Sequence, residues 1–127
     1  MLRKFLASAF AVAAAAALAT PAEATPTESA YLVLTVSGSQ GPTRAGTLRC
    51  GPNGGIHHSP DAACAALTQV DGDFDQLNVA PDRACTLQYD PVHVTAFGRW
   101  RGKRIDFATT YGNPCVLVVT TGPVFRV

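Results

Sequence analysis

Few side chains in this sequence have the types and spacing that an enzyme's active site requires. His57 and His58 are neighbours in a Gly- and Pro-rich segment, and His93 stands alone in a predicted strand. The chain has no G-x-S-x-G motif, and its even number of cysteines leaves no thiol over as a nucleophile. The sequence therefore indicates a protein that is not an enzyme and needs no cofactor.

A short acidic stretch, Asp71-Gly72-Asp73-Phe74-Asp75, is similar to the start of a calcium-binding loop. Gln76 stands where the sharp turn of such a loop requires glycine, and Asp82 stands where a bidentate glutamate is expected. We therefore expect these carboxylates to be solvated at the end of a helix, and we expect no bound metal.

Residues 85–91 are better suited to binding another molecule than to catalysis. They are Cys85, Thr86, Leu87, Gln88, Tyr89, Asp90 and Pro91. Leu87 follows a cysteine by two residues and precedes a turn-forming segment. It is either buried in a strand or presented outward on a loop that the cysteine holds. Proline fixes its own φ and biases Asp90 toward an extended conformation, which would stiffen such a loop.

The first 24 residues predict a secretory signal peptide. Arg3 and Lys4 are basic, residues 5–19 are apolar and rich in alanine, and a small-residue A-x-A site ends at Ala24. The apolar run is shorter than the ~20 residues of a membrane span, and no second apolar run follows it. We expect cleavage after Ala24 and a secreted domain over residues 25–127 that does not bind membranes.

The net charge of residues 25–127 argues against nucleic acid as a partner. Without Arg3, Lys4 and Glu23, the ten basic and nine acidic residues of the chain become eight of each. A domain without a basic excess does not hold phosphates or anionic lipid by charge, which argues against nucleic acid as a partner. Its length suits one domain.

The four cysteines of this domain are Cys50, Cys64, Cys85 and Cys115. An even count in a small secreted chain predicts two disulfides. Three pairings are possible in principle, and order and spacing favour Cys50–Cys64 and Cys85–Cys115 because each closes one local segment. A zinc site is the competing interpretation, but the sequence has no C-x-x-C spacing.

The elements that must position these residues are mostly strands. The β-forming and alternating patterns predict about five short strands, at 31–36, 44–50, 92–96 and 104–108, with a last one over 116–120 and 123–127. Ser59, Pro60 and Asp61 predict the start of the one clear helix, which continues to Gln69. The pattern predicts an α+β fold in which a helix packs on an antiparallel sheet.

Several motifs together resemble the Streptomyces subtilisin inhibitor family. The most specific combination is Cys85 followed by Tyr89-Asp90-Pro91-Val92, then Gly98-Arg99-Trp100-Arg101-Gly102-Lys103-Arg104, with both cysteine pairs in this order. Residues 32–36, 63–67, 72–77, 113–115 and 124–125 extend the resemblance across nearly the whole domain. Single pieces such as Val-Leu-Thr-Val are weak evidence on their own.

The resemblance implies a five-stranded antiparallel sheet packed with two helices, two disulfides and a homodimer joined partly through the region of Tyr31 to Val36. It also implies a substrate-like loop that inhibits subtilisin-like, and by extension chymotrypsin-like, serine proteases. Carried over by position, Leu87 is the specificity residue and Leu87–Gln88 the reactive bond, with Cys85, Thr86, Tyr89 and Asp90 as flanks. Relatives often have proline in place of Thr86, and methionine or lysine in place of Leu87.

Two other functions fit the sequence. One is a secreted binding module whose loop grips a different partner, such as a transglutaminase or a protease of another class. The other is a small secreted hydrolase whose site has no recognisable motif. Stoichiometric inhibition of a protease distinguishes the inhibitor from both.

Overall fold

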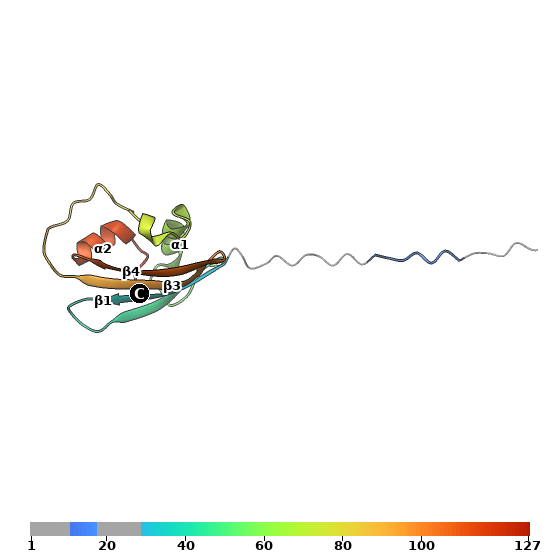
Figure 1. Cartoon of the computed structure of the whole chain (residues 1–127), viewed down its shortest axis with the longest axis horizontal. Helices are drawn as coiled ribbons and strands as arrows, with labels where there is room; N and C mark the ends of the chain where they lie inside the picture. Colours follow the sequence, from blue (N-terminus) through green and yellow to red (C-terminus); the bar gives the residue numbers. More distant parts are fainter. Residues whose placement is uncertain (1–10, 18–28) are drawn as a thin grey trace, which may run out of the picture.

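One antiparallel sheet organises the fold, and the computed structural model describes it within residues 29–127, together with a short stretch at 11–17. The strands are β1 (Ala30–Ser37), β2 (Arg44–Cys50), β3 (Val92–Trp100) and β4 (Lys103–Tyr111). They lie side by side in the order β2-β1-β3-β4, and every neighbouring pair is antiparallel (Figure 1).

The prediction of five strands is wrong, because the described part of the chain forms a four-stranded sheet. The segment expected as the last strand instead forms helix α2 (Pro114–Thr121), followed by a turn. Its valines favour strands locally. The helix begins nonetheless because the Asn113 side chain caps it and Pro114 occupies the first turn, where a missing N–H costs nothing.

Helix α1 (Pro60–Gln69) begins where the sequence predicts, but its cap differs in detail. The backbone carbonyl of Ser59 accepts a hydrogen bond from the N–H of Ala63, while the Ser59 hydroxyl makes no capping bond. The chain then leaves the helix through Gly72, whose φ is +73°. A Cβ there would lie 2.3 Å from the Trp100 ring, so only glycine allows this approach. A short 3₁₀ helix, η2 (Phe74–Gln76), follows.

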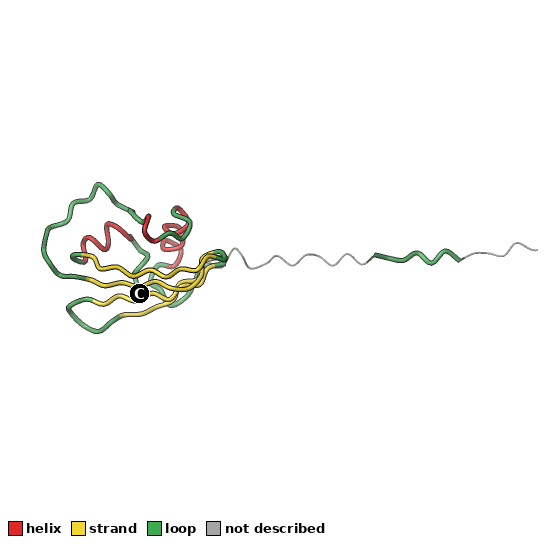
Figure 2. The backbone as a smooth tube through the Cα atoms, viewed as in Figure 1, coloured by secondary structure: helices red, strands yellow, loops and turns green. Residues whose placement is uncertain are grey.

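Both helices lie on the same side of the sheet (Figures 1 and 2). Alternate residues of β1, namely Leu32, Leu34 and Val36, point into this layer and are almost fully buried. The rest of the core comes from the other strands, from both helices and from the C-terminal turn, and includes Leu48, Leu67, Val94, Trp100, Leu117, Val124 and Phe125.

The opposite side of the sheet, called the open face here, has no helix over it. Tyr31 is 51% exposed and Phe97 is 49% exposed on this side. The strand register aligns Arg49, Tyr31, Arg99 and Arg104 in one row across the sheet, called the arginine row here. Asp106 lies one row further along, opposite Phe97. Within residues 29–127, none of these arginines forms an ion pair with a carboxylate.

The predicted signal peptide falls mostly outside the described residues. Of residues 1–24 only 11–17 are described, and they form neither helix nor strand. The predicted cleavage site at Ala24 lies outside the described residues. A search of the described ranges finds no helix with the length and apolar character needed to cross a membrane.

Candidate functional site

Leu87 lies in a long loop, residues 77–91, that joins η2 to β3 without any helix or strand. Its side chain is 100% exposed, and that of Tyr89 is 86% exposed. Leu87 is therefore presented outward, and the alternative of a buried strand is wrong. In Figure 1 this 77–91 loop, drawn in yellow, arcs outward at one end of the domain.

Asn113 holds the backbone on both sides of Leu87. Its Nδ2 donates to the carbonyl oxygen of Thr86 at 3.0 Å and to that of Gln88 at 2.9 Å. Its Oδ1 accepts from the N–H of Val116 at 2.9 Å, which caps α2. The side chain is 6% exposed, so these bonds are shielded from competing water. One buried amide thus fixes the loop and the helix to each other.

The sequence interpretation did not assign this role to Asn113. Asparagine before proline at the start of a helix is a capping signal, and that signal was present in Asn113-Pro114. A cap uses only the side-chain oxygen, however. The two remaining donors on Nδ2 had to find acceptors, and only the folded chain shows that these belong to the 77–91 loop.

A disulfide fixes the loop just before Leu87. Cys85 and Cys115 are bonded, with 5.8 Å between their Cα atoms, so the loop is tied to the first turn of α2. The second bond, Cys50–Cys64, joins the end of β2 to α1 and lies outside the loop. Order and spacing favour this same pairing, and no free cysteine remains in the described chain.

Backbone bonds hold both ends of the loop. At its start, the N–H groups of Val79 and Ala80 donate to the carbonyls of Thr120 and Val119 in α2, at 3.0 and 2.8 Å. After Leu87, the N–H of Asp90 donates to the carbonyl of Gly112 at 2.9 Å. The loop is therefore fixed before and after an exposed centre.

The histidines do not form a catalytic group. His57 Nδ1 accepts from the N–H of Ser59, and its Nε2 donates to the carbonyl of Val124. His93 contacts the Thr110 hydroxyl on the open face. These contacts assign structural roles to both side chains.

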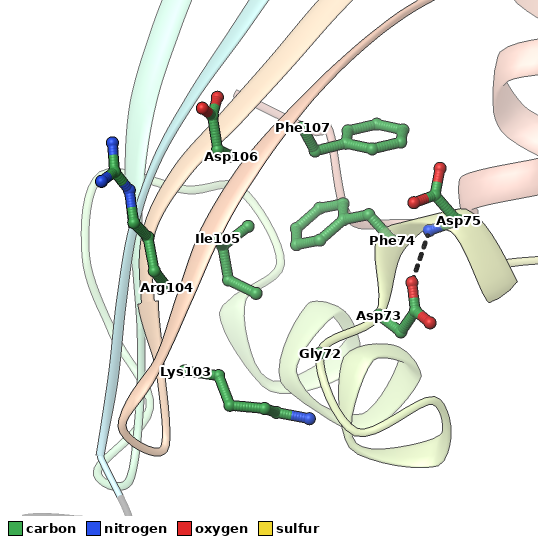
Figure 3. Close-up of a pocket in the computed structure, with 9 residues that line it drawn as sticks. All are labelled: Gly72, Asp73, Phe74, Asp75, Lys103, Arg104, Ile105, Asp106 and Phe107. Carbon is green, nitrogen blue, oxygen red and sulfur yellow. Dashed lines mark hydrogen bonds between the residues drawn. The ribbon is translucent and has the colours of Figure 1, made fainter.

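The acidic stretch after α1 borders a hollow of about 300 Å³ (Figure 3). Phe74 and Phe107 stack there with ring centroids 5.2 Å apart. Asp73 accepts from the N–H of Asp75 and thereby caps η2. No group of three or more His, Cys, Asp or Glu side chains that could hold a metal occurs in residues 11–17 and 29–127.

The Asp71 carboxylate also has partners within the domain. It pairs with Lys103 at 2.9 Å and accepts from the Trp100 indole at 3.2 Å. The hydrogen bond from Lys103, and after it the bond from Trp100, hold the pKa of Asp71 below its usual range. The carboxylate ties the end of α1 to the β3–β4 turn, which is a structural role.

The fold and the loop together define a class: a small domain with two disulfides that displays one rigid, exposed peptide segment for recognition. The family model described as "Subtilisin inhibitor-like" matches residues 28–113. This chain belongs to the subtilisin inhibitor-like family.

Individual relatives agree with this assignment. Subtilisin inhibitor-like protein 5 of Streptomyces fradiae is 49% identical over 100 residues, which cover 74% of this chain and 94% of the relative. Trypsin inhibitor STI2 of Streptomyces longisporus is 46% identical over 91 residues, which cover 67% of this chain and 63% of the relative. Both are named as inhibitors and not as enzymes.

A solved structure of similar fold is Streptomyces caespitosus sermetstatin in complex with Bacillus licheniformis subtilisin. It matches with a TM-score of 0.64 and 35% sequence identity, over 78% of this chain and 99% of that chain.

Proposed function

We propose that this protein is a secreted, substrate-like inhibitor of subtilisin-type serine proteases, with Leu87–Gln88 as its reactive bond. Family membership supports the inhibitor class, and the complex of sermetstatin with subtilisin supports the kind of partner. The observation that carries the choice of site is the fully exposed Leu87, flanked by two carbonyls that one buried amide holds.

A fixed loop explains tight binding. Docking a flexible peptide costs the entropy of ordering its backbone and side chains, whereas a loop ordered before contact avoids most of this cost. An extended segment can then pair with the edge of the protease's sheet while Leu87 enters a hydrophobic specificity pocket. Burial of one leucine side chain contributes roughly 1.5–3 kcal/mol.

The same contacts explain why such an inhibitor is not consumed as a substrate. When the protease serine attacks the Leu87 carbonyl, it forms an ester and releases the amine of Gln88. Cys85–Cys115 keeps one side of the cut near the domain, and Asn113 holds the carbonyls of Thr86 and Gln88. The amine therefore stays beside the ester and can attack it, which re-forms the peptide bond and frees the serine.

Secretion and self-association belong to the same proposal. The signal-peptide pattern supports export and cleavage after Ala24, so that the mature chain begins at Thr25. Intact mass of the protein from culture medium tests this, and a secreted form that still includes residues 5–24 would contradict it. The open face, with its exposed Tyr31 and Phe97, supports a homodimer joined partly through the region of Tyr31 to Val36.

Titration against a panel of serine proteases tests the function itself. We expect stoichiometric inhibition of subtilisin that requires the protease's free active site, weaker inhibition of chymotrypsin and poor inhibition of trypsin. The bond cut slowly in the complex should be Leu87–Gln88, with the fragments still joined by Cys85–Cys115. Failure to inhibit any serine protease would favour a binding module with another partner.

A further inference from the structure

A hydroxyl group from a distant part of the chain meets the 77–91 loop on the far side of the proposed reactive bond. Ser39 Oγ donates a hydrogen bond to Asp90 Oδ1, across a separation of 51 residues in the sequence. Ser39 lies in the turn between β1 and β2, and Figures 1 and 2 show this turn at the same end of the domain as the loop.

The turn that carries Ser39 is itself well fixed. Strands β1 and β2 are paired up to Val36 and Arg44. Just beyond this pair, the hydroxyls of Ser37 and Thr43 lie 2.7 Å apart and close the turn. Gly41 has a φ of +92°, a conformation that allows a short, tight reversal. A bond from Ser39 therefore ties Asp90 to a turn that the paired strands β1 and β2 hold in place.

The Ser39 bond is the side-chain contact that holds the segment after Gln88, beside one backbone bond. Tyr89 is 86% exposed. The backbone of Asp90 makes one bond, to Gly112, before β3 begins at Val92. A hollow of about 470 Å³ lies beside Asp90, lined in part by Val36, Pro42 and Leu117, so the released side chain would have room to move. A hydrogen bond to a carboxylate is stronger than one between neutral groups.

We propose that Ser39 is a positioning residue of the reactive loop. By holding Asp90 it keeps the segment from Gln88 to Asp90 aligned after the reactive bond is cut, so that the Gln88 amine remains placed to re-form the bond. This inference rests on the proposed function. It assigns to the β1–β2 turn a part in inhibition that the family resemblance and the 77–91 loop alone do not assign.

The test compares Ser39→Ala with Gln40→Ala, which shortens an exposed side chain of the same turn and leaves both the Ser39–Asp90 and the Ser37–Thr43 bonds in place. For each protein we would measure the inhibition constant for subtilisin, the rate at which subtilisin cleaves Leu87–Gln88, and the melting temperature. Ser39→Thr, which keeps a hydroxyl, and Ser39→Ala in an Asp90→Ala background complete the set.

We expect Ser39→Ala to raise the cleavage rate and the inhibition constant about 3- to 10-fold, the range of one lost, partly exposed hydrogen bond to a charged group. Gln40→Ala should match the wild type in both, Ser39→Thr should restore them, and the effect should vanish in the Asp90→Ala background. If the wild type inhibits but Ser39→Ala behaves as Gln40→Ala, the positioning role is wrong and the proposed function stands. If the wild type itself does not inhibit, both are wrong.

Discussion

At the scale of single residues, Leu87 should determine which protease is bound. Leu87→Ala removes most of the apolar area that enters the pocket and should weaken subtilisin binding by about 1–3 kcal/mol. Ile56→Ala is the matched control, since Ile56 is 72% exposed but lies outside the loop. Inhibition constants measured with subtilisin provide the test, and equal constants for Leu87→Ala and the wild type would show that Leu87 is not the specificity residue.

The charge of the side chain at position 87 should determine whether trypsin is inhibited. A leucine in the trypsin pocket removes water from the pocket carboxylate without supplying a cation, which is unfavourable. Leu87→Lys supplies that cation and should convert the protein into an inhibitor of trypsin, with weaker inhibition of subtilisin. Paired titrations of both proteases measure this exchange, and a Lys variant without any gain against trypsin would contradict it.

Asn113 both caps α2 and holds the 77–91 loop, and one substitution can separate these two roles. Asn113→Asp keeps the oxygen that caps α2 at Val116, but it replaces the Nδ2 donor with a carboxylate oxygen facing the carbonyls of Thr86 and Gln88. We expect faster cleavage of the reactive bond, whereas Asn113→Ala should also lose the cap, which costs about 1 kcal/mol of folding stability. Calorimetry and cleavage rates together distinguish the two. Equal cleavage rates in Asn113→Asp and the wild type would mean that Asn113 only caps the helix.

At the scale of elements, the two disulfides should contribute similarly to folding stability but differently to inhibition. Their sequence separations of 14 and 30 residues predict similar contributions to stability, about 3–4 kcal/mol each. Only Cys85–Cys115 ties the loop to α2. Replacing both of its cysteines with alanine should therefore impair inhibition more than replacing Cys50 and Cys64, when both variants are assayed well below their melting temperatures. Equal losses of inhibition would count against this.

The elements differ in how well the sequence predicts them. Strand β1 could be predicted because β-forming residues are dense in it, and the β3–β4 hairpin because its side chains alternate between the two faces of the sheet. Helix α2 could not be predicted from local sequence, because Val116, Val118 and Val119 favour strands. The Asn113 cap and the Cys85–Cys115 disulfide outweigh this local preference. Leu87 was assigned from the family motif, whereas the bonds of Ser39 and Asn113 to the loop join positions far apart in the sequence, which no local pattern reveals.

At the scale of the whole molecule, the proposed dimer depends on the open face. Val33 lies in the centre of this face, paired with Thr47 on one side and Phe97 on the other. Val33→Lys would place a charge in the interface and should yield monomers by light scattering at micromolar concentration. Ala65→Lys, a charge added to the exposed side of α1 on the other side of the sheet, should leave the mass unchanged. A wild type that is already monomeric would contradict the proposed dimer.

The arginine row makes that association sensitive to salt. In the proposed dimer, a two-fold axis through the open face would bring a second copy of Arg49, Arg99 and Arg104 toward the first, with Asp106 as the one carboxylate on the strands of this face in each described domain. Like charges repel less when salt screens them, and the screening length falls from about 10 Å at 0.1 M to about 3 Å at 1 M ionic strength. The dimer should therefore tighten as sodium chloride rises, and Arg99→Gln should reduce this dependence; a dimer that weakens with salt would contradict it. A monomer carries one reactive loop and a dimer carries two. The number of proteases that one inhibitor particle can bind would then rise with the ionic strength of the medium.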